Sequence, residues 1–280
     1  MLSFPKSDRG GAFLIIIGER LNSSRRVVLE ALQKKDADYL CGQAVAQEKA
    51  NAAYIDLNAA AMMDREIDTL CWAIPLLQRA VKVPLALDTP NPQAMEAALK
   101  AHQGRALLNS LSGDSVALEA LLPLIKRFRP RVIALCLDNE GPPENADIAV
   151  SRARKMADIL QSAGLHPADI FIDPLVRPIG VDHTSGLVFL ESVARIKSAL
   201  PGVKTIAGVS NVSFGLPQRR LINRTLLVLA MAKGLDAAIC DPLDADVQAS
   251  LAASEALLGQ DPSLRNYLSY IREQAKKSGA

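Results

Sequence analysis

The sequence predicts an α/β protein, and specifically a closed (β/α)8 TIM barrel of eight parallel strands that alternate with helices. Two observations carry this prediction. Short runs rich in Val, Ile, Leu and Ala recur eight times along the 280 residues, and stretches with apolar residues at three- and four-residue spacing lie between them. Runs that are apolar on both faces, each followed by a helix, are typical of parallel strands joined by crossover helices. Eight such units in one uninterrupted chain favour closure into a barrel.

The predicted strands lie at residues 13–17, 53–57, 83–87, 105–108, 132–137, 170–172, 204–209 and 237–240. Helical spacing is clear at Leu118, Leu121, Leu122 and Ile125, and a further helix is expected over residues 185–200. Gly and Pro occur singly at boundaries and no linker divides the chain, so we expect one domain over residues 1–280. An amphipathic segment at about residues 262–277 predicts an extra C-terminal helix that closes the barrel floor or forms a dimer contact.

A doubly wound open sheet is the alternative fold. Its nucleotide-binding pattern, G-x-G-x-x-G after the first strand, is absent, because Gly18-Glu19-Arg20-Leu21-Asn22 stands there.

Composition excludes several classes of function. The chain has 32 basic and 30 acidic residues without long basic runs, which disfavours nucleic acid as the main ligand. The longest apolar runs fall short of the roughly 20 residues that a membrane span needs, and no signal-peptide pattern opens the chain. The four cysteines are far apart with no C-x-x-C pair, so we expect a reduced cytoplasmic protein.

Every predicted strand has a carboxylate or an amide at or just after its end. These residues are Glu19, Asp56 with Asn58, Asp88, Asn109, Asp138, Asp173, Asn211 and Asp241. In a (β/α)8 barrel all these positions meet at one mouth, where such enzymes carry their chemistry. Helix capping or a turn explains any single one of them, and is the preferred reading for Asp241, which precedes Pro242. Capping explains the whole set poorly, because Ser and Thr cap equally well and are almost missing there.

A mouth with many acceptors, several amides and few cations suits a ligand rich in N–H donors. A divalent metal held by carboxylates is the competing interpretation. None of the three histidines follows a strand or pairs with Cys or Glu at ligand spacing, which disfavours zinc and iron, and we expect no tightly bound metal. A Gly-x-Ser-x-Gly nucleophile motif is also missing, since residues 208–212 read GVSNV.

Several of these strand ends together resemble one family. The segments are residues 17–22 (IGERLN), 54–58 (YIDLN), 87–91 (LDTPN), 109–110 (NS), 172–175 (IDPL), 208–217 (GVSNVSFGLP) and 221–224 (LINR). In this order and spacing the chain resembles the methyltetrahydrofolate methyltransferases. These are pterin-binding barrels that exchange a methyl group between N5 of tetrahydrofolate and the cobalt of a corrinoid protein. The folate domain of cobalamin-dependent methionine synthase and, more distantly, dihydropteroate synthase belong to the same superfamily.

The resemblance implies roles for the residues at the mouth. Asp88, Asn109 and Asp173 would hold the pyrimidine ring of the pterin. We expect Asp173 to accept both the 2-amino group and N3–H, because a carboxylate can accept a donor pair in bidentate fashion. Asn211 would reach N5 and stabilise the charge that develops there, since an amide can donate or accept.

The remaining site residues are also assigned through the resemblance. Asp56 and Asn58 would organise water or pterin edges and take part in catalysis with Asn211. Gly208 and Ser210 would shape the strand end. Family members also carry Arg at the position of Arg219. The position of Asp138 is often Asn in the family, and a contact to the far N–H groups of the ring would tolerate either residue. Phe214 stands where some members carry Gln, on the side of the methyl donor.

The resemblance also predicts partners. The corrinoid-binding pattern D-x-H-x-x-G is not matched by residues 182–186 (DHTSG), so we expect a separate corrinoid protein that belongs to an O-demethylase, a methylamine or betaine demethylase, or the acetyl-CoA pathway. A homodimer is expected from the family, and the direction of transfer stays open. Three alternatives remain: a dihydropteroate synthase-like enzyme, a non-catalytic pterin-binding protein and a metal-dependent aldolase. The first of these would need a cationic stretch at the position where Ser210-Asn211-Val212 stands.

Overall fold

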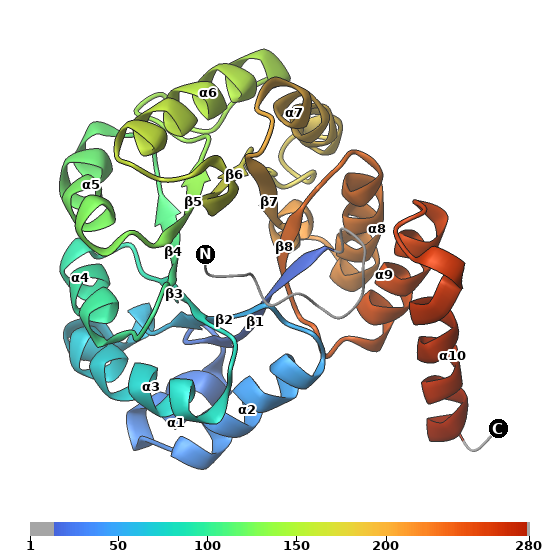
Figure 1. The fold of residues 1–280 in the computed structure, drawn as a ribbon, viewed down its shortest axis with the longest axis horizontal. Helices are drawn as coiled ribbons and strands as arrows, with labels where there is room; N and C mark the ends of the chain where they lie inside the picture. Colours follow the sequence, from blue (N-terminus) through green and yellow to red (C-terminus); the bar gives the residue numbers. More distant parts are fainter. Residues whose placement is uncertain (1–13, 279–280) are drawn as a thin grey trace.

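The computed structural model describes residues 14–278, and it confirms the barrel. Eight strands, all parallel to their neighbours, close in chain order, with β1 paired to both β2 and β8 (Figure 1). The strands are β1 Ile15–Asn22, β2 Tyr54–Asn58, β3 Leu85–Asp88, β4 Leu107–Leu111, β5 Arg131–Leu135, β6 Ile170–Asp173, β7 Lys204–Gly208 and β8 Ala237–Cys240. Residue 13, where the first strand was predicted to begin, lies outside the described residues.

Helices form the outer layer around this ring (Figure 1). They are α1 Arg26–Lys34, α2 Ala37–Lys49, α3 Glu66–Ala80, α4 Pro92–Ala101, α5 Ser115–Phe128, α6 Ala146–Ser162, α7 Ser185–Ala199, α8 Arg219–Ala232, α9 Ala245–Leu257 and α10 Arg265–Ser278. Short 3-10 turns are η1 Ala60–Arg65, η2 Pro167–Asp169, η3 Val209–Ser213 and η4 Pro262–Leu264. No helix within residues 14–278 is long and apolar enough to cross a membrane.

Several helices begin at Asp or Asn residues that lie outside the strand-end set. The side chains of Asp36, Asn91, Asp114, Asn145 and Asp244 accept backbone N–H groups in the first turns of α2, α4, α5, α6 and α9. Capping in these helices therefore does not use the carboxylates and amides at the ends of the strands.

The apolar runs are buried on both faces, as the prediction of parallel strands requires. One residue from each strand points inward and fills the barrel: Ile17, Tyr54, Ala86, Leu107, Ile133, Phe171, Ile206 and Ala237. The alternate residues pack outward against the helices in a second, larger core. The interior of the barrel is thus filled by side chains, and the polar residues at the strand ends lie at its mouth.

Strand β1 is longer than predicted, because it contains an irregularity. The pairing of β1 with β2 shifts register between Gly18 and Leu21, so Glu19 and Arg20 lie within the strand rather than after it. A Cβ atom at Gly18 would collide with the side-chain oxygen of the buried Gln47. The same oxygen accepts a hydrogen bond from the backbone N–H of Arg20 at 3.0 Å, which holds it in place. Glycine is required here by the close approach of helix α2.

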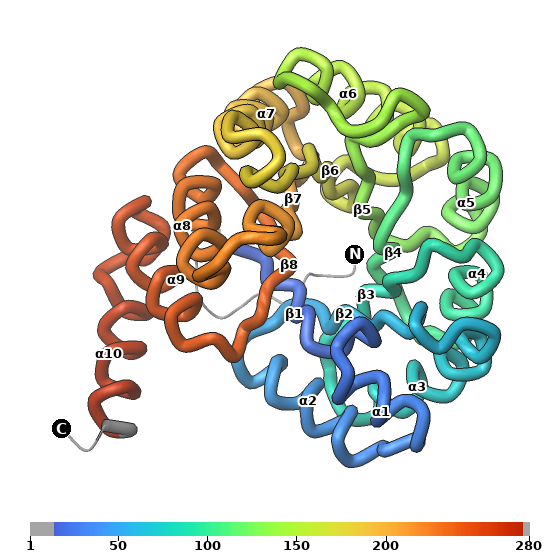
Figure 2. Tube along the Cα trace, turned by 180° about the vertical axis from the view of Figure 1, so that it is seen from behind, coloured from blue at the N-terminus to red at the C-terminus, as the bar shows by residue number. Residues whose placement is uncertain are grey.

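The C-terminal helix does not close the barrel floor. Helix α10 lies outside the ring beside α9, its main packing partner in the described part of the chain (Figures 1 and 2). Leu268 and Ile271 on α10 remain exposed. The prediction of floor closure is wrong, because the helix packs against the flank of its neighbour, and the predicted dimer contact stays a prediction.

Candidate active site

The ends of β2, β3 and β4 bring four of the predicted site residues into direct contact. Asn58 is paired with Asp88 in the ladder of β2 and β3, and Asp88 with Asn109 in the ladder of β3 and β4. The Asn109 Nδ2 donates to Asp56 Oδ1 at 3.0 Å, and the Asn58 Nδ2 donates to Asp88 Oδ2 at 3.0 Å. The convergence that the sequence predicted is therefore present on this side of the mouth.

These contacts fix how the two amides are oriented. Asn109 turns its NH2 group toward Asp56, which leaves its Oδ1 to accept a donor from elsewhere. Asn58 is more fully engaged: its Oδ1 also accepts the Ser23 Oγ–H at 2.8 Å and the Ala60 N–H at 3.1 Å. In this arrangement Asn58 holds Asp88 in place, and its predicted part in a water network stays a prediction.

Burial changes the acidity of the carboxylates at the mouth. It raises the pKa of Asp173 to about 7 and that of Asp88 to about 6, and it raises the pKa of Asp56 well above its ordinary value, with the neighbouring Asp88 adding to the effect. Burial also raises the pKa of Glu19 on β1 to about 7. Carboxylates that lack water in this way gain from N–H donors of a ligand, which stabilise the ionised form.

Asp173 ends β6 and is buried. Its Oδ1 accepts the Leu175 N–H at 2.8 Å, and the backbone of Gly208 at the end of β7 also bonds to the carboxyl and lowers its pKa somewhat. Backbone donors therefore hold the carboxyl from two neighbouring strand ends. The turn is tight, because Leu175 has a φ of 64°.

The turn after β7 carries the other predicted groups. Arg219 donates to the Ser210 carbonyl at 2.8 Å and to the Ser213 Oγ at 3.1 Å, so it braces turn η3 from the start of α8. Its guanidinium also lies 5.8 Å from the ring centre of the exposed Phe214. The side chain of Asn211 is exposed and has no hydrogen-bond partner among residues 14–278. It is available to a ligand.

Comparison with known proteins adds to this geometry. Residues 18–241 match the family model described as "Pterin binding enzyme", from the first strand to the end of the eighth. The chain belongs to the pterin-binding enzymes. It is 34% identical over 262 residues to the methylcorrinoid:tetrahydrofolate methyltransferase of Eubacterium limosum, an alignment that covers 93% of this chain and 97% of the relative. It is 27% identical over 241 residues to the methionine synthase of Mycobacterium tuberculosis, covering 81% of this chain and 20% of that protein.

Solved structures agree on the fold. Dihydropteroate synthase from Xanthomonas albilineans, in complex with 7,8-dihydropteroate, superposes with a TM-score of 0.67 at 18% identity and covers 88% of this chain and 94% of its own. This likeness shows that the fold is shared.

Asp138, which was predicted to contact the pterin, pairs with an arginine of this pterin-binding enzyme, and its contact with the ring stays a prediction. The Oδ2 of Asp138 pairs with the Arg152 Nε at 2.7 Å, and its Oδ1 accepts the Glu140 N–H at 3.0 Å. Sequence reasoning missed Arg152, because it lies in the middle of α6 beside the exposed Arg154 and Lys155 and carries no motif. Asp241 is likewise engaged, by Arg20 at 2.8 Å and by the Leu243 N–H at 2.9 Å, as a turn residue would be.

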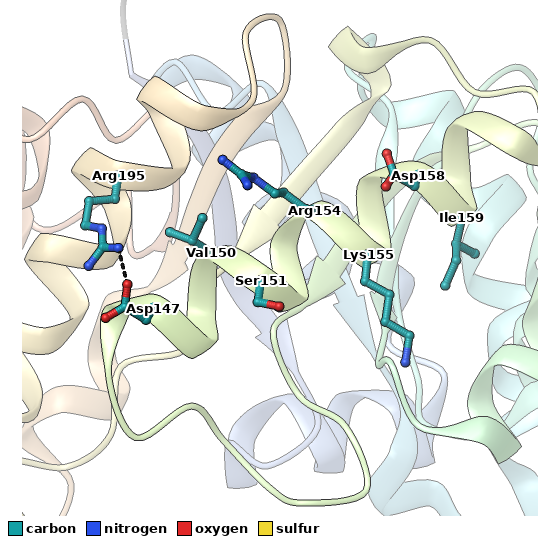
Figure 3. A pocket seen from close by; sticks show the side chains of 8 residues that line it. All are labelled: Asp147, Val150, Ser151, Arg154, Lys155, Asp158, Ile159 and Arg195. Carbon is teal, nitrogen blue, oxygen red and sulfur yellow. Dashed lines mark hydrogen bonds and ion pairs between the residues drawn. The ribbon is translucent and has the colours of Figure 1, made fainter.

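A surface depression of about 670 Å³ lies away from the mouth, between α6 and α7 in the helical layer (Figure 3). An ion pair between Asp147 and Arg195 links the two helices across it, and Arg154, Lys155 and Asp158 add exposed charges. None of the predicted site residues lines it. Within residues 14–278, no group of three or more His, Cys, Asp or Glu is arranged to hold a metal ion.

Proposed function

We propose that this pterin-binding enzyme moves a methyl group between the corrinoid of a partner protein and N5 of tetrahydrofolate. The observation that carries the proposal is the arrangement of polar residues at the strand ends. The buried Asp173 ends β6, the half-buried Asp88 and Asn109 lie at the ends of β3 and β4, and the exposed amide of Asn211 follows β7. The relative named methylcorrinoid:tetrahydrofolate methyltransferase, aligned over nearly its whole length, supports the same activity.

The acceptors match the donor side of a pterin. Asp173 would take the 2-amino group and N3–H, and two charge-assisted hydrogen bonds of this kind are the strongest that an uncharged ring can form here. The free oxygens of Asp88 and Asn109 would accept further ring N–H groups, because their other polar atoms are held by Asn58 and Asp56. Recognition would rest on hydrogen bonds, since only 4% of the residues are aromatic.

The chemistry is set by N5. A neutral tertiary amine is a poor leaving group, so methyl transfer away from N5 requires a proton or a strong hydrogen bond at that atom. Asn211 would donate to N5 in that direction and accept from N5–H in the other. Asp56 is buried with a raised pKa and is therefore suited to hold a proton, which water could pass toward N5. The rest of the task is to align two reacting centres, which is a matter of positioning.

We also propose the partners and context that the resemblance implies. The corrinoid would be supplied by a separate protein, as part of a demethylase or an acetyl-CoA pathway, and the chain would act as a homodimer that uses no tightly bound metal. The exposed Leu268 and Ile271 on α10 would lie in the dimer contact. All four cysteines are free thiols, which suits the cytoplasm.

The test is a spectroscopic assay without oxygen. Purified chain is mixed with tetrahydrofolate and with free methylcobalamin or a methylated corrinoid protein, and the cobalt spectrum is followed. We expect demethylation of the cobalt with at least one donor, and its loss in the Asp173→Asn variant. An unchanged spectrum with every donor would overturn the proposal.

A further inference from the structure

The loop between β5 and α6 forms the wall of the mouth between two of the proposed pterin ligands. Strand β5 pairs with β4, which carries Asn109, and with β6, which ends in Asp173. Two backbone hydrogen bonds tie the beginning of the loop to both neighbours. The Cys136 N–H donates to the carbonyl of Asp173 at 2.9 Å, and the Gly113 N–H donates to the carbonyl of Leu137 at 2.6 Å. A shift of this loop would therefore also shift the backbone to which it is bonded, at Asp173 and beside the end of β4, and so change the distance between Asn109 and Asp173.

One side chain holds the loop against helix α6. Arg152 is only 9% exposed, and each of its guanidinium nitrogens contacts the loop. Its Nε pairs with Asp138 at 2.7 Å, and its Nη1 donates to the carbonyls of Gly141 at 2.6 Å and Cys136 at 3.4 Å. Its Nη2 contacts Glu140 at 3.2 Å. A planar fork with five donors can grip the loop from residue 136 to residue 141 in this way, whereas a lysine could make only part of these contacts.

Asp138 is the closer and more buried of the two carboxylates that pair with Arg152, since Glu140 is exposed. Both of its carboxylate oxygens accept from the protein, one from Arg152 and the other from the Glu140 N–H. The loop closes on itself beside it, because the Gly141 N–H donates to the Asp138 carbonyl at 3.0 Å. Asp138 differs from Asp173 and Asp88 in that a buried guanidinium already pairs with its carboxylate, so it has less to offer to a ring N–H.

We propose that Arg152 is a positioning residue for pterin binding, and that Asp138 serves as its anchor rather than as a ligand of the ring. The inference rests on the proposed function and assigns a task within it. Arg152 reaches the pterin only through the backbone that joins Cys136 and Leu137 to the neighbouring strand ends. Small misplacements of binding groups cost affinity steeply, so a rigid wall sharpens the placement of Asn109 and Asp173.

Stability alone does not require this pair. Taking two charges out of water is costly, and buried ion pairs in proteins can often be replaced by neutral side chains of similar size with little loss of stability. The double variant Asp138→Asn with Arg152→Met neutralises both partners. It therefore tests whether the contacts of Arg152 with the loop affect pterin binding, without leaving an unpaired buried charge. The exposed Arg154 on the same helix gives a matched control, Arg154→Met.

The experiment measures the dissociation constant of tetrahydrofolate by calorimetry without oxygen, together with kcat, KM and the melting temperature. We expect Arg152→Met and Asp138→Asn each to weaken binding by about tenfold, and the double variant to bind no more weakly than Arg152→Met. The KM should rise in parallel while kcat at saturation changes less than about twofold, because Asn211 lies on another loop. Arg152→Lys should fall between wild type and Arg152→Met, and Arg154→Met should match the wild type.

The outcomes separate the inference from the proposed function. If the wild type does not bind tetrahydrofolate, the proposed function fails. If the wild type binds and the folded Arg152→Met variant binds equally well, with only a lower melting temperature, Arg152 is merely structural and the inference is wrong. If the losses of the two single variants multiply in the double variant, Asp138 contacts the ring itself, which also overturns the inference. Should Arg152→Met fail to fold, Arg152→Lys and the neutral double variant decide by the same criteria.

Discussion

Acidification should weaken tetrahydrofolate binding through the buried carboxylate of Asp173. Burial raises its pKa to about 7, so a growing share of the free protein carries a proton there as the pH falls below 7. The proposed ligand donates two N–H groups and needs the ionised form, which means that the proton must leave on binding. The pKa of Asp88, about 6, adds a second acid of the same kind.

The size of the effect follows from these two values. Between pH 8 and pH 6 the ionised fraction of Asp173 falls by about tenfold and that of Asp88 by about twofold, so the dissociation constant should rise by about 20-fold. Calorimetry in two buffers of different ionisation enthalpy would report the affinity and the number of protons released. That number should be about 1.4 at pH 6, with about 0.9 from Asp173 and about 0.5 from Asp88. The control is Asp182→Asn, because the half-buried Asp182 pairs with Arg177 and its pKa lies below its ordinary value through hydrogen bonds from Thr184. This variant should keep the wild-type pH dependence. An affinity that is constant from pH 8 to pH 6, with no proton release, would refute the reasoning.

Further predictions follow from single sites. Asn211→Ala should lower kcat by about 100-fold, while the dissociation constant of tetrahydrofolate changes by less than about threefold. Single-turnover rates and calorimetry would measure the two effects. Equal turnover would remove Asn211 from the mechanism. Asp173→Asn should raise the melting temperature of the ligand-free protein by about 5 °C at pH 8, because it removes a buried charge, and should have no such effect at pH 4. A lower melting temperature of the variant at pH 8 would contradict the cost that we assign to that charge. Gly18→Ala should destabilise the fold by about 2 kcal/mol in urea unfolding, because the new Cβ atom meets the buried Gln47. A Cβ atom at Gly42 would meet no atom within 4 Å, so Gly42→Ala should be neutral or stabilising. Similar unfolding midpoints for the two variants would argue against the close contact at Gly18.

The fold could be predicted because two-sided burial leaves a direct trace in the sequence. The strand Ile170–Asp173 is buried at every position, and its apolar run ends at the polar residue that faces the mouth. The end of β1 could not be predicted in the same way. Glu19 and Arg20 are polar and look like a loop, and they are kept in the strand by a register shift and by contacts from α2 that are far away in sequence.

The candidate site also contains residues whose positions could be predicted from the sequence and one whose position could not. The position of Asp88, Asn109 and Asp173 at the mouth could be predicted, because strand ends in a barrel must meet. Arg152 was not, because α6 carries basic residues at positions 152, 154 and 155 and only the folded loop shows that the first of them turns inward. The sequence likewise predicts that α10 is amphipathic, but which neighbour it packs against depends on the tertiary structure.

The mouth of this enzyme is built at a cost to its own stability. A carboxyl whose folded pKa lies above its unfolded value stabilises the fold below the unfolded pKa, and that contribution is lost as the pH rises through the folded pKa. For Asp173 the rise from 3.8 to about 7 corresponds to a loss on the order of 4 kcal/mol at neutral pH and above. If Asp173 binds the pterin as proposed, ligand N–H groups would replace the water lost on burial and restore part of this free energy. In the ligand-free protein, the buried apolar residues of β6 offset the cost of the charge that ends the strand.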